Sequence, residues 1–173
     1  MTAPINPATT DYVRETFALL GDRDPLAIMA ETPAWIAERV HGLSDAAMRR
    51  PEGPGRWSLV EVLSHLADAE IAFAWRVRII LTQDRPPMLG YDQGAWLTRF
   101  DYANADSAEA LHVFTSLRHW NYRIWRTTTP ADLDRIGMHM ERGPETADTL
   151  RKMIAGHDLR HRRQIERLLV VVR

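Results

Sequence analysis

The fold and the candidate site are both predicted by one stretch near the C-terminus, which reads GHDLRHRRQI from Gly156 to Ile165. It lies within a run from Thr149 to Val172 in which apolar residues recur at the spacing of a single buried helix face. These apolar positions are Leu150, Met153, Ile154, Ile165, Leu168 and Val172. His157 and His161 fall in the gap of this pattern, so the buried face continues through two imidazoles.

Two histidines four residues apart on a helix differ by about 40° of rotation and about 6 Å of rise, so His157 and His161 leave the same face. Burying two imidazoles side by side costs free energy unless both donate a lone pair to one cation. The same spacing also occurs in histidines that are merely exposed or hydrogen-bonded. His65, from another predicted helix, is the third candidate ligand, although its own surroundings favour a helix-flank histidine paired with Asp68 or a backbone carbonyl. His41, His112, His119 and His139 have no comparable context, and we expect surface or loop positions for them.

Working outward from this stretch, the periodicity predicts a single all-α domain over residues 1–173, with residues 1–8 as a flexible N-terminus. A short helix capped by Thr9 or Thr10 should end at Leu20. A second should begin at Asp24 and end near Gly42, with Pro33 kinking or splitting it at Thr32. Further helices are expected over residues 59–82, 107–127 and 149–172, and no strand is predicted. Four long helices with an extra N-terminal helical segment indicate a four-helix bundle.

Two of these helices have clear start signals. Ser58 and Glu61 form a capping box, and Asp106 with Glu109 forms a second. The inner face of the helix over residues 107–127 is expected to consist of Ala110, Val113, Phe114, Leu117, Trp120, Asn121 and Ile124. The long loop from Asp84 to Tyr102, with Tyr91, Asp92 and Trp96, is predicted to act as a lid.

Composition excludes several classes of function. Hydrophobic residues make up 45% and charged residues 26% of the chain, as in soluble globular proteins. The net charge of −1 gives no general attraction to nucleic acid or to an anionic membrane, so neither is expected as a partner. The absence of cysteine rules out disulfides, thiolate ligands and a cysteine nucleophile, and a cytoplasmic location fits best.

Two motifs resemble those of the DinB-like superfamily. RWSLVEVLSHLADAE, from Arg56 to Glu70, is similar to its W-S-x-x-E-x-x-x-H-L-x-D-x-E signature, and Gly156 to Ile165 resembles its closing H-D-x-x-H-x-x-Q-I. The loop from Arg85 to Trp96 is similar to that of one branch. The resemblance extends from about Pro25 to Leu168. It implies an up-down-down-up four-helix bundle, usually a homodimer, with a divalent metal ion on three histidines.

The resemblance places the three metal ligands at His65, His157 and His161. Zinc or nickel is expected, since both accept imidazole ligands and leave a coordination position open. Asp68 and Asp158 are in reach to orient the ligands and are the candidate catalytic residues, although each could equally be a solvated carboxylate. Gln164 could hydrogen-bond a ligand, and Gly156 suggests a close approach of another backbone.

Three functions remain open at this stage. The first is a metal-dependent enzyme acting on a small-molecule substrate. The superfamily includes thiol-dependent S-transferases that use a low-molecular-weight thiol cosubstrate, and members provisionally described as metal-dependent hydrolases. The second is a non-catalytic, metal-stabilised dimer that binds a small molecule or a partner. DNA binding is the third and the least supported, because there is no basic stripe.

Overall fold

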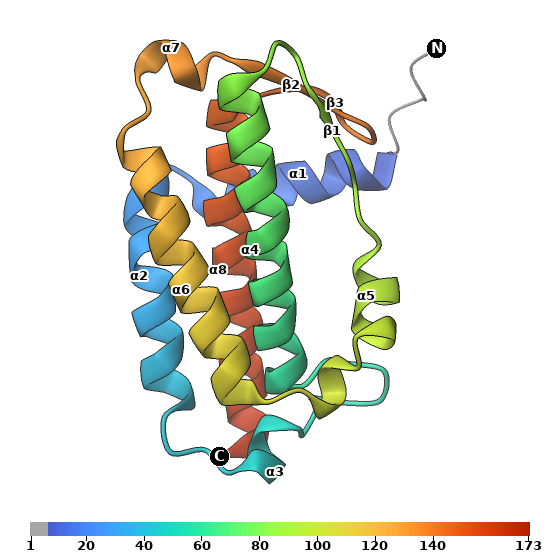
Figure 1. Ribbon diagram of the computed structural model, residues 1–173. Coiled ribbons are helices and arrows are strands. Elements are labelled where there is room, and N and C mark those ends of the chain that lie inside the picture. The colour runs from blue at the N-terminus through green and yellow to red at the C-terminus, as the bar shows by residue number, and fades with distance from the viewer. Residues whose placement is uncertain (1–6) are drawn as a thin grey trace.

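The computed structural model describes the backbone of residues 7–173 and the side chains of residues 11–173. Helices dominate it (Figure 1). They are α1 (Pro7–Leu20), α2 (Pro25–Val40), α3 (Asp45–Met48), α4 (Leu59–Thr82), α5 (Gln93–Arg99), α6 (Ser107–Arg126), α7 (Pro130–Leu133) and α8 (Ala147–Val172), with a 3-10 turn, η1 (Tyr102–Asn104). Among these described residues, no helix combines the length and the apolar character that crossing a membrane requires.

The four long helices α2, α4, α6 and α8 form the bundle, and α1 crosses its side against α8 (Figure 1). α4 and α6 run in the same direction, and α2 and α8 run opposite to them (Figure 1). The connection from Gln83 to Asp106 therefore has to return along the length of the bundle, and it carries α5 and η1 on the way. This is the predicted up-down-down-up arrangement with an extra N-terminal helix.

The predicted capping residues begin the helices as expected. The backbone N–H of Ser58 donates to Glu61 Oε2 at 2.7 Å before α4. Asp106 Oδ1 accepts from the N–H of Glu109 at 3.0 Å before α6. Each contact satisfies a polar group that the first turn of a helix leaves unpaired, which is why these short motifs locate helix starts reliably.

The N-terminal helix begins earlier than predicted. α1 starts at Pro7, so Thr9 and Thr10 lie inside the helix and neither caps it. Proline is well tolerated in the first turn of a helix, where its missing N–H has no intrahelical partner. Of the predicted flexible segment over residues 1–8, residues 1–6 lie outside the described part of the chain, and the remaining two are helical.

Of the two outcomes predicted for Pro33, a kink or a split at Thr32, the split does not occur. α2 continues from Pro25 to Val40 with Pro33 inside it. A proline at this position leaves the carbonyl of Met29 without its usual helical donor. Arg118 on α6 donates to that carbonyl from Nη1 at 3.2 Å, so the lost hydrogen bond is replaced from a neighbouring helix.

A small sheet, which the sequence analysis did not predict, closes one end of the bundle (Figure 1). β1 (Pro87–Met88) pairs in parallel with β2 (Ile136–His139), and β2 pairs antiparallel with β3 (Gly143–Thr146). Strands of two and four residues are too short to show the alternation by which strands are recognised in a sequence. The sheet places His139, a residue of β2, in a buried position.

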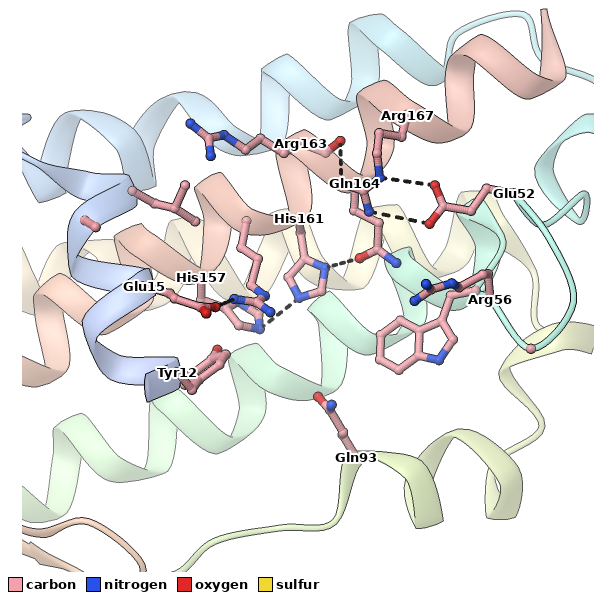
Figure 2. Close-up of a pocket in the computed structure, with 15 residues that line it drawn as sticks. Tyr12, Glu15, Glu52, Arg56, Gln93, His157, His161, Arg163, Gln164 and Arg167 are labelled. Atoms are coloured by element: carbon pink, nitrogen blue, oxygen red, sulfur yellow. Dashed lines mark hydrogen bonds and ion pairs between the residues drawn. The ribbon is translucent and has the colours of Figure 1, made fainter. Parts of the chain in front are cut away.

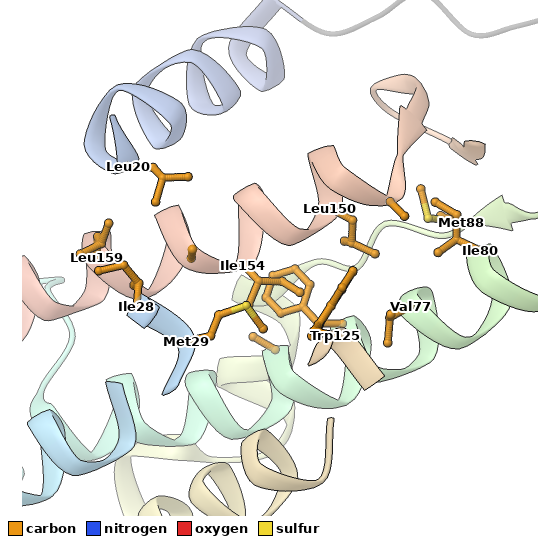
Figure 3. Close-up of a cluster of buried hydrophobic side chains, with 14 of the residues drawn as sticks. Leu20, Ile28, Met29, Val77, Ile80, Met88, Trp125, Leu150, Ile154 and Leu159 are labelled. Carbon is orange, nitrogen blue, oxygen red and sulfur yellow. The ribbon is translucent and has the colours of Figure 1, made fainter. Parts of the chain in front are cut away.

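The apolar core is divided into two clusters along the bundle. One packs around Met29, Val77, Trp125 and Ile154 at the end nearer the sheet (Figure 3). The other packs around Ile36, Leu63, Phe114 and Ile165 towards the opposite end. Buried polar side chains lie between them along the helices: His65, Glu70, Arg118, His157, Asp158 and His161. This polar layer contains the candidate site.

Candidate metal centre

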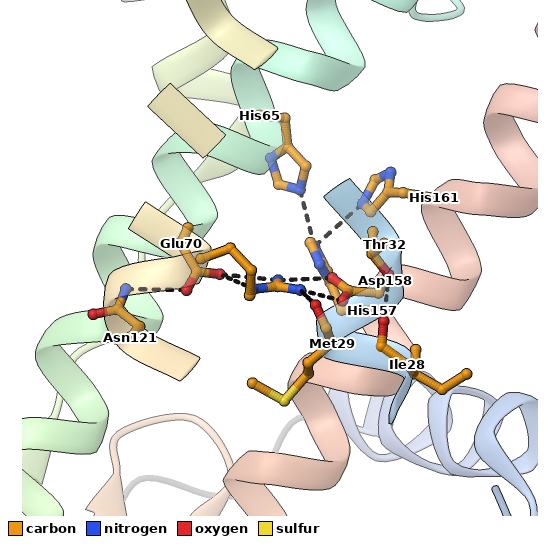
Figure 4. A network of polar contacts seen from close by, with 10 residues as sticks. Ile28, Met29, Thr32, His65, Glu70, Asn121, His157, Asp158 and His161 are labelled. Atoms are coloured by element: carbon orange, nitrogen blue, oxygen red, sulfur yellow. Dashed lines mark hydrogen bonds and ion pairs between the residues drawn. The ribbon is translucent and has the colours of Figure 1, made fainter. Parts of the chain in front are cut away.

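Three histidine rings from two helices meet in the polar layer. His65 Nε2 lies 3.1 Å from His157 Nε2, and His161 Nε2 lies 3.2 Å from the same atom (Figure 4). One nitrogen from each of the three rings lies within 4.8 Å of the others. α8 supplies His157 and His161 one turn apart, and α4 supplies His65 across the bundle. The structure thus brings together all three residues expected from the sequence.

The spacing of these nitrogens suits a single tetrahedral ion. Ligand nitrogens about 2.0–2.1 Å from a tetrahedral centre are separated from each other by about 3.3–3.4 Å. The two separations at His157 are close to that value. An imidazole that ligates through Nε2 must carry its proton on Nδ1, and His161 Nδ1 lies 2.9 Å from Gln164 Oε1, an acceptor. The donor set therefore fits a divalent metal ion.

The rings are held in the neutral form that metal ligation requires. Burial, and then His161, lowers the pKa of His65 to about 3. Burial, with a smaller contribution from Arg160, lowers the pKa of His161 to about 4, although the hydrogen bond that His161 donates to Gln164 opposes this shift. Burial is also the main cause that places the pKa of His157 well below its ordinary value. At neutral pH all three rings are uncharged.

Aromatic rings pack around the histidines. Trp57, just before the start of α4, lies with its ring centroid 5.0 Å from that of His65 and 6.4 Å from that of His161. Phe73 meets His157 edge-on at 5.5 Å. Gly156 allows α1 to approach α8 beside the site, since a Cβ there would lie 2.6 Å from the carbonyl oxygen of Thr16. The close backbone approach expected at Gly156 is confirmed.

A buried arginine next to the histidines was missed by the sequence analysis. Arg118 on α6 is 1% exposed and donates to Asp158 Oδ1 at 2.9 Å and to Glu70 Oε2 at 3.0 Å (Figure 4). Arg118 also donates to the carbonyl of Met29, so this α6 residue makes hydrogen bonds to α2, α4 and α8. Burial alone would lower the pKa of Arg118, but the carboxylates of Asp158 and Glu70 raise it, so the guanidinium stays charged. Because Asp158 follows His157 directly, this network fixes the rotation of α8 at the site.

The two carboxylates expected to orient the histidines have other partners. Asp158 is fully buried and is bound by Arg118. Asp68 accepts a hydrogen bond from the hydroxyl of Tyr102 in η1. The residue that holds a histidine ring is Gln164, whose expected hydrogen bond to a ligand is present at His161.

Helix α6 is also rotated relative to the predicted inner face. Trp120, expected inside, is 57% exposed, whereas Trp125 is 2% exposed and lies in the core. The predicted inner face included neither Arg118 nor Trp125, both of which are buried. Burying the guanidinium between two carboxylates turns that side of the helix inward.

A cavity of about 850 Å³ lies over His157 and His161 (Figure 2). Tyr12 and Glu15 of α1 line one side of it, and Glu52 lines the opposite side. Four arginines line it as well, namely Arg56, Arg160, Arg163 and Arg167. Arg160 pairs with Glu15 at 3.2 Å and Arg167 pairs with Glu52 at 3.2 Å. The histidines can thus be reached by a small molecule through a cationic opening.

The predicted lid is an ordered connection that contains a short helix. Asp92 caps α5 by accepting from the N–H of Gly94 at 2.9 Å. Trp96 stacks on Tyr91 with centroids 4.4 Å apart. Gln93, at the start of α5, lines the cavity over the histidines (Figure 2). The loop therefore forms part of the wall near the site.

His139 is not a surface residue, contrary to the prediction. It lies in β2 and is 2% exposed, whereas His41, His112 and His119 are exposed as expected. Burial, followed by Arg142 and Arg76, lowers the pKa of His139 to about 3, so its ring is neutral. The prediction failed because it assigned this part of the chain to irregular structure and did not anticipate the sheet.

Fold and site together define a four-helix-bundle protein with a buried three-histidine centre. The family model of the DinB superfamily matches residues 29–165, and the chain belongs to this superfamily.

Individual relatives agree with this assignment. YfiT of Bacillus subtilis (strain 168), provisionally named a metal-dependent hydrolase, is 26% identical over 125 residues, which cover 72% of this chain and 68% of YfiT. A protein of Geobacillus thermodenitrificans with the same provisional name is 26% identical over 64% of this chain and 62% of its own length. The chain thus spans less than two thirds of that relative.

A solved structure shows the same architecture. The structure of YfiT from Bacillus subtilis, described as a four-helix bundle of unusual topology, matches with a TM-score of 0.78 at 25% identity and covers 83% of each chain. In this chain, the parallel pair α4 and α6 with its long return connection gives an up-down-down-up order (Figure 1).

Proposed function

We propose that this protein is a metal-dependent hydrolase whose divalent ion is held by His65, His157 and His161. The observation that carries the proposal is the convergence of three neutral imidazoles, two of which, His157 and His161, line a cavity of about 850 Å³. Three ligands leave a tetrahedral ion one position for water or substrate, which distinguishes reactive sites from closed structural ones. The provisional names of the relatives support the same activity.

When bound, such an ion acts as a Lewis acid and lowers the pKa of a coordinated water towards about 7. The protein's own residues prepare the site for it. Gln164 keeps the proton of His161 on Nδ1 and so presents Nε2 to the ion. Phe73 and Trp57 exclude water from the sides of the rings. Imidazole ligands of intermediate softness favour zinc or nickel over magnesium or calcium.

The proposal assigns no general base. Asp68 and Asp158, the candidates from the sequence, do not line the cavity, and each is hydrogen-bonded elsewhere. We therefore propose that Asp158 positions His157 through Arg118 and does not touch substrate. Glu15 and Glu52 line the cavity, and each is paired with an arginine.

A second candidate function is thiol-dependent S-transfer. Four arginines line the cavity, and guanidinium groups bind carboxylates such as the acidic groups of a low-molecular-weight thiol. Because the chain has no cysteine, the sulfur nucleophile would have to come from such a cosubstrate. The ion would bind the thiol at its open position in place of water.

One experiment separates these functions. The chain is stripped of metal, reloaded with zinc or nickel, and assayed against a panel of esters and amides, and then against an electrophile with mycothiol, bacillithiol or glutathione. Metal-dependent turnover without thiol is the expected result. Turnover only with a thiol would establish the transferase, and no turnover under any condition would favour the non-catalytic binding module.

We also propose that the protein is a homodimer, as the superfamily resemblance implies. Ile71 and Trp75 lie one turn apart on α4 and are 50% and 63% exposed. Exposed large apolar side chains grouped in this way are typical of contact surfaces. Sedimentation equilibrium should give twice the monomer mass, and Trp75→Lys should reduce it to the monomer mass.

A further inference from the structure

A second, smaller cavity of about 310 Å³ is also lined by His157. It shares His157, Tyr12 and Gln93 with the larger cavity. Phe73 and Arg76 of α4 and Met153 of α8 line it, and the sheet end closes it with His139, Glu141 and Arg142. A molecule bound at the histidines could therefore extend one end into this space.

Arg76 is the unusual residue of this smaller cavity. It is 5% exposed, and its Nη2 donates to the carbonyl of Leu89 at 2.6 Å. Among the residues that the structure describes, no carboxylate lies within 4.0 Å of its guanidinium, whereas the neighbouring Arg142 pairs with Glu145 at 2.9 Å. A buried cation without an anionic partner destabilises the folded chain strongly. Such a residue is therefore unexpected unless a ligand supplies the anion.

His139 adds an unpaired donor to the same wall. Its Nδ1 accepts a hydrogen bond from the backbone N–H of Glu141 at 3.2 Å, which places the ring proton on Nε2. That Nε2 is buried and has no hydrogen-bond partner within the described part of the chain. The buried guanidinium of Arg76 and the buried N–H of His139 thus offer donors to an anion in this cavity.

The charge around the cavity limits the kind of acceptor. Glu141 lines the cavity but is exposed, so water screens its charge more than that of Arg76. A singly charged carboxylate can pair with Arg76 under these conditions. A doubly charged phosphate would meet stronger repulsion from Glu141 and Glu145.

We propose that the cavity lined by Arg76 and His139 binds the carboxylate of a small organic acid, so that the substrate is held there while its reacting bond lies at the histidines. The assignment of substrate class rests on the proposed function, but the binding site itself does not. Phe73 contacts both the ring of His157 and the cavity, so the bound acid would have an apolar part beside its carboxylate.

Benzoate is a suitable probe, because it combines a carboxylate with an apolar ring. Its affinity is measured by calorimetry on the metal-stripped and on the zinc-loaded chain, for the natural sequence, Arg76→Met and Arg56→Met. Arg56 lines only the larger cavity, which makes it a matched control. We expect benzoate to bind both forms with similar affinity, at least 10-fold more weakly to Arg76→Met, and unchanged to Arg56→Met.

A second readout covers the case in which Arg76→Met fails to fold. In the natural chain with ¹⁵N-labelled histidine, benzoate should shift the Nε2–H resonance of His139. Benzoate binding that needs zinc and is unaffected by Arg76→Met would show that the carboxylate ligates the ion, and would overturn the proposal. Tighter binding of inorganic phosphate than of benzoate would also overturn it. The zinc content of the loaded chain tests the proposed function separately.

Discussion

Two buried polar clusters lie side by side in this bundle, and they differ in how they are satisfied. Around Arg118, the guanidinium meets the carboxylates of Asp158 and Glu70 and the carbonyl of Met29, so donors and acceptors match within the protein. Around His157, three neutral rings direct Nε2 atoms at one another, and at most one can donate to its neighbour in each pair. The first cluster is complete, whereas the second needs a ligand.

This difference shows which polar cluster stabilises the fold and which one serves function. A complete ion network favours a single arrangement of the helices. Removing one of its partners lowers the free energy of unfolding strongly. A cluster with surplus lone pairs destabilises the metal-free chain, and binding of a cation to these lone pairs stabilises it. The two clusters share α8 through the adjacent residues His157 and Asp158.

The largest expected effect is on metal binding. His157→Ala removes the central nitrogen of the triad, so stoichiometric zinc should fall to background after loading and dialysis. His112→Ala, which changes an exposed histidine on α6, should keep full occupancy. Elemental analysis of both variants measures their zinc content. Full zinc content in His157→Ala would show that His157 is not a ligand.

The complete cluster should give the largest effect on stability. Arg118→Met leaves Asp158 and Glu70 buried without a cation, and the free energy of unfolding should fall by about 3–5 kcal/mol. Arg167→Met breaks the exposed pair with Glu52 and should cost less than about 1 kcal/mol. Urea denaturation of the metal-stripped proteins measures both, and equal losses would contradict the comparison.

The incomplete cluster should make the metal-free chain sensitive to mild acid. The pKa of His65 is lowered to about 3 and that of His161 to about 4, whereas in the unfolded chain both rings titrate near their ordinary value. At a pH between the lowered pKa of the folded chain and the ordinary pKa of the unfolded chain, the unfolded state binds more protons. The free energy of unfolding is therefore highest above the ordinary pKa and falls as the pH drops below it. Lowering the pH from 7.5 to 5 should cost about 2 kcal/mol for each ring.

Urea titrations of the metal-stripped chain at several pH values measure this dependence. Replacing His65 by Asn should flatten the curve, and His112→Asn should leave it unchanged. A stability that is constant from pH 7.5 to pH 5 would mean that the rings are not held neutral. The sign is opposite to that of a histidine stabilised by a carboxylate, whose contribution would grow in this range.

The smallest effect is expected at the residue that orients a ligand. Gln164→Leu removes the acceptor for His161 Nδ1–H without touching the ion, and zinc affinity should fall about 10–100-fold. Gln164→Glu keeps the acceptor and should retain most of the affinity. Competition with a chromogenic chelator measures both, and equal affinity for Gln164→Leu and the natural chain would exclude this role.

The sequence predicts a feature well when the residues that form it lie on one helix, and poorly when they lie on different elements. His157 and His161 share one helix, so periodicity alone placed them on the same face. His65 required the resemblance to the superfamily, because nothing local to α4 indicates what lies across the bundle. Arg118 was missed, since an arginine on an amphipathic helix is normally solvated, and its partners come from three other helices. The pairing of β1 with β2, distant in sequence, is likewise not encoded locally.

The most direct test is X-ray absorption at the zinc edge of the loaded chain. Three imidazole nitrogens at about 2.0–2.1 Å, together with one further light atom, are the predicted first shell. In His65→Ala the number of imidazoles should drop to two. A first shell made mainly of carboxylate oxygens, or one that is unchanged in His65→Ala, would show that α4 and α8 do not share an ion.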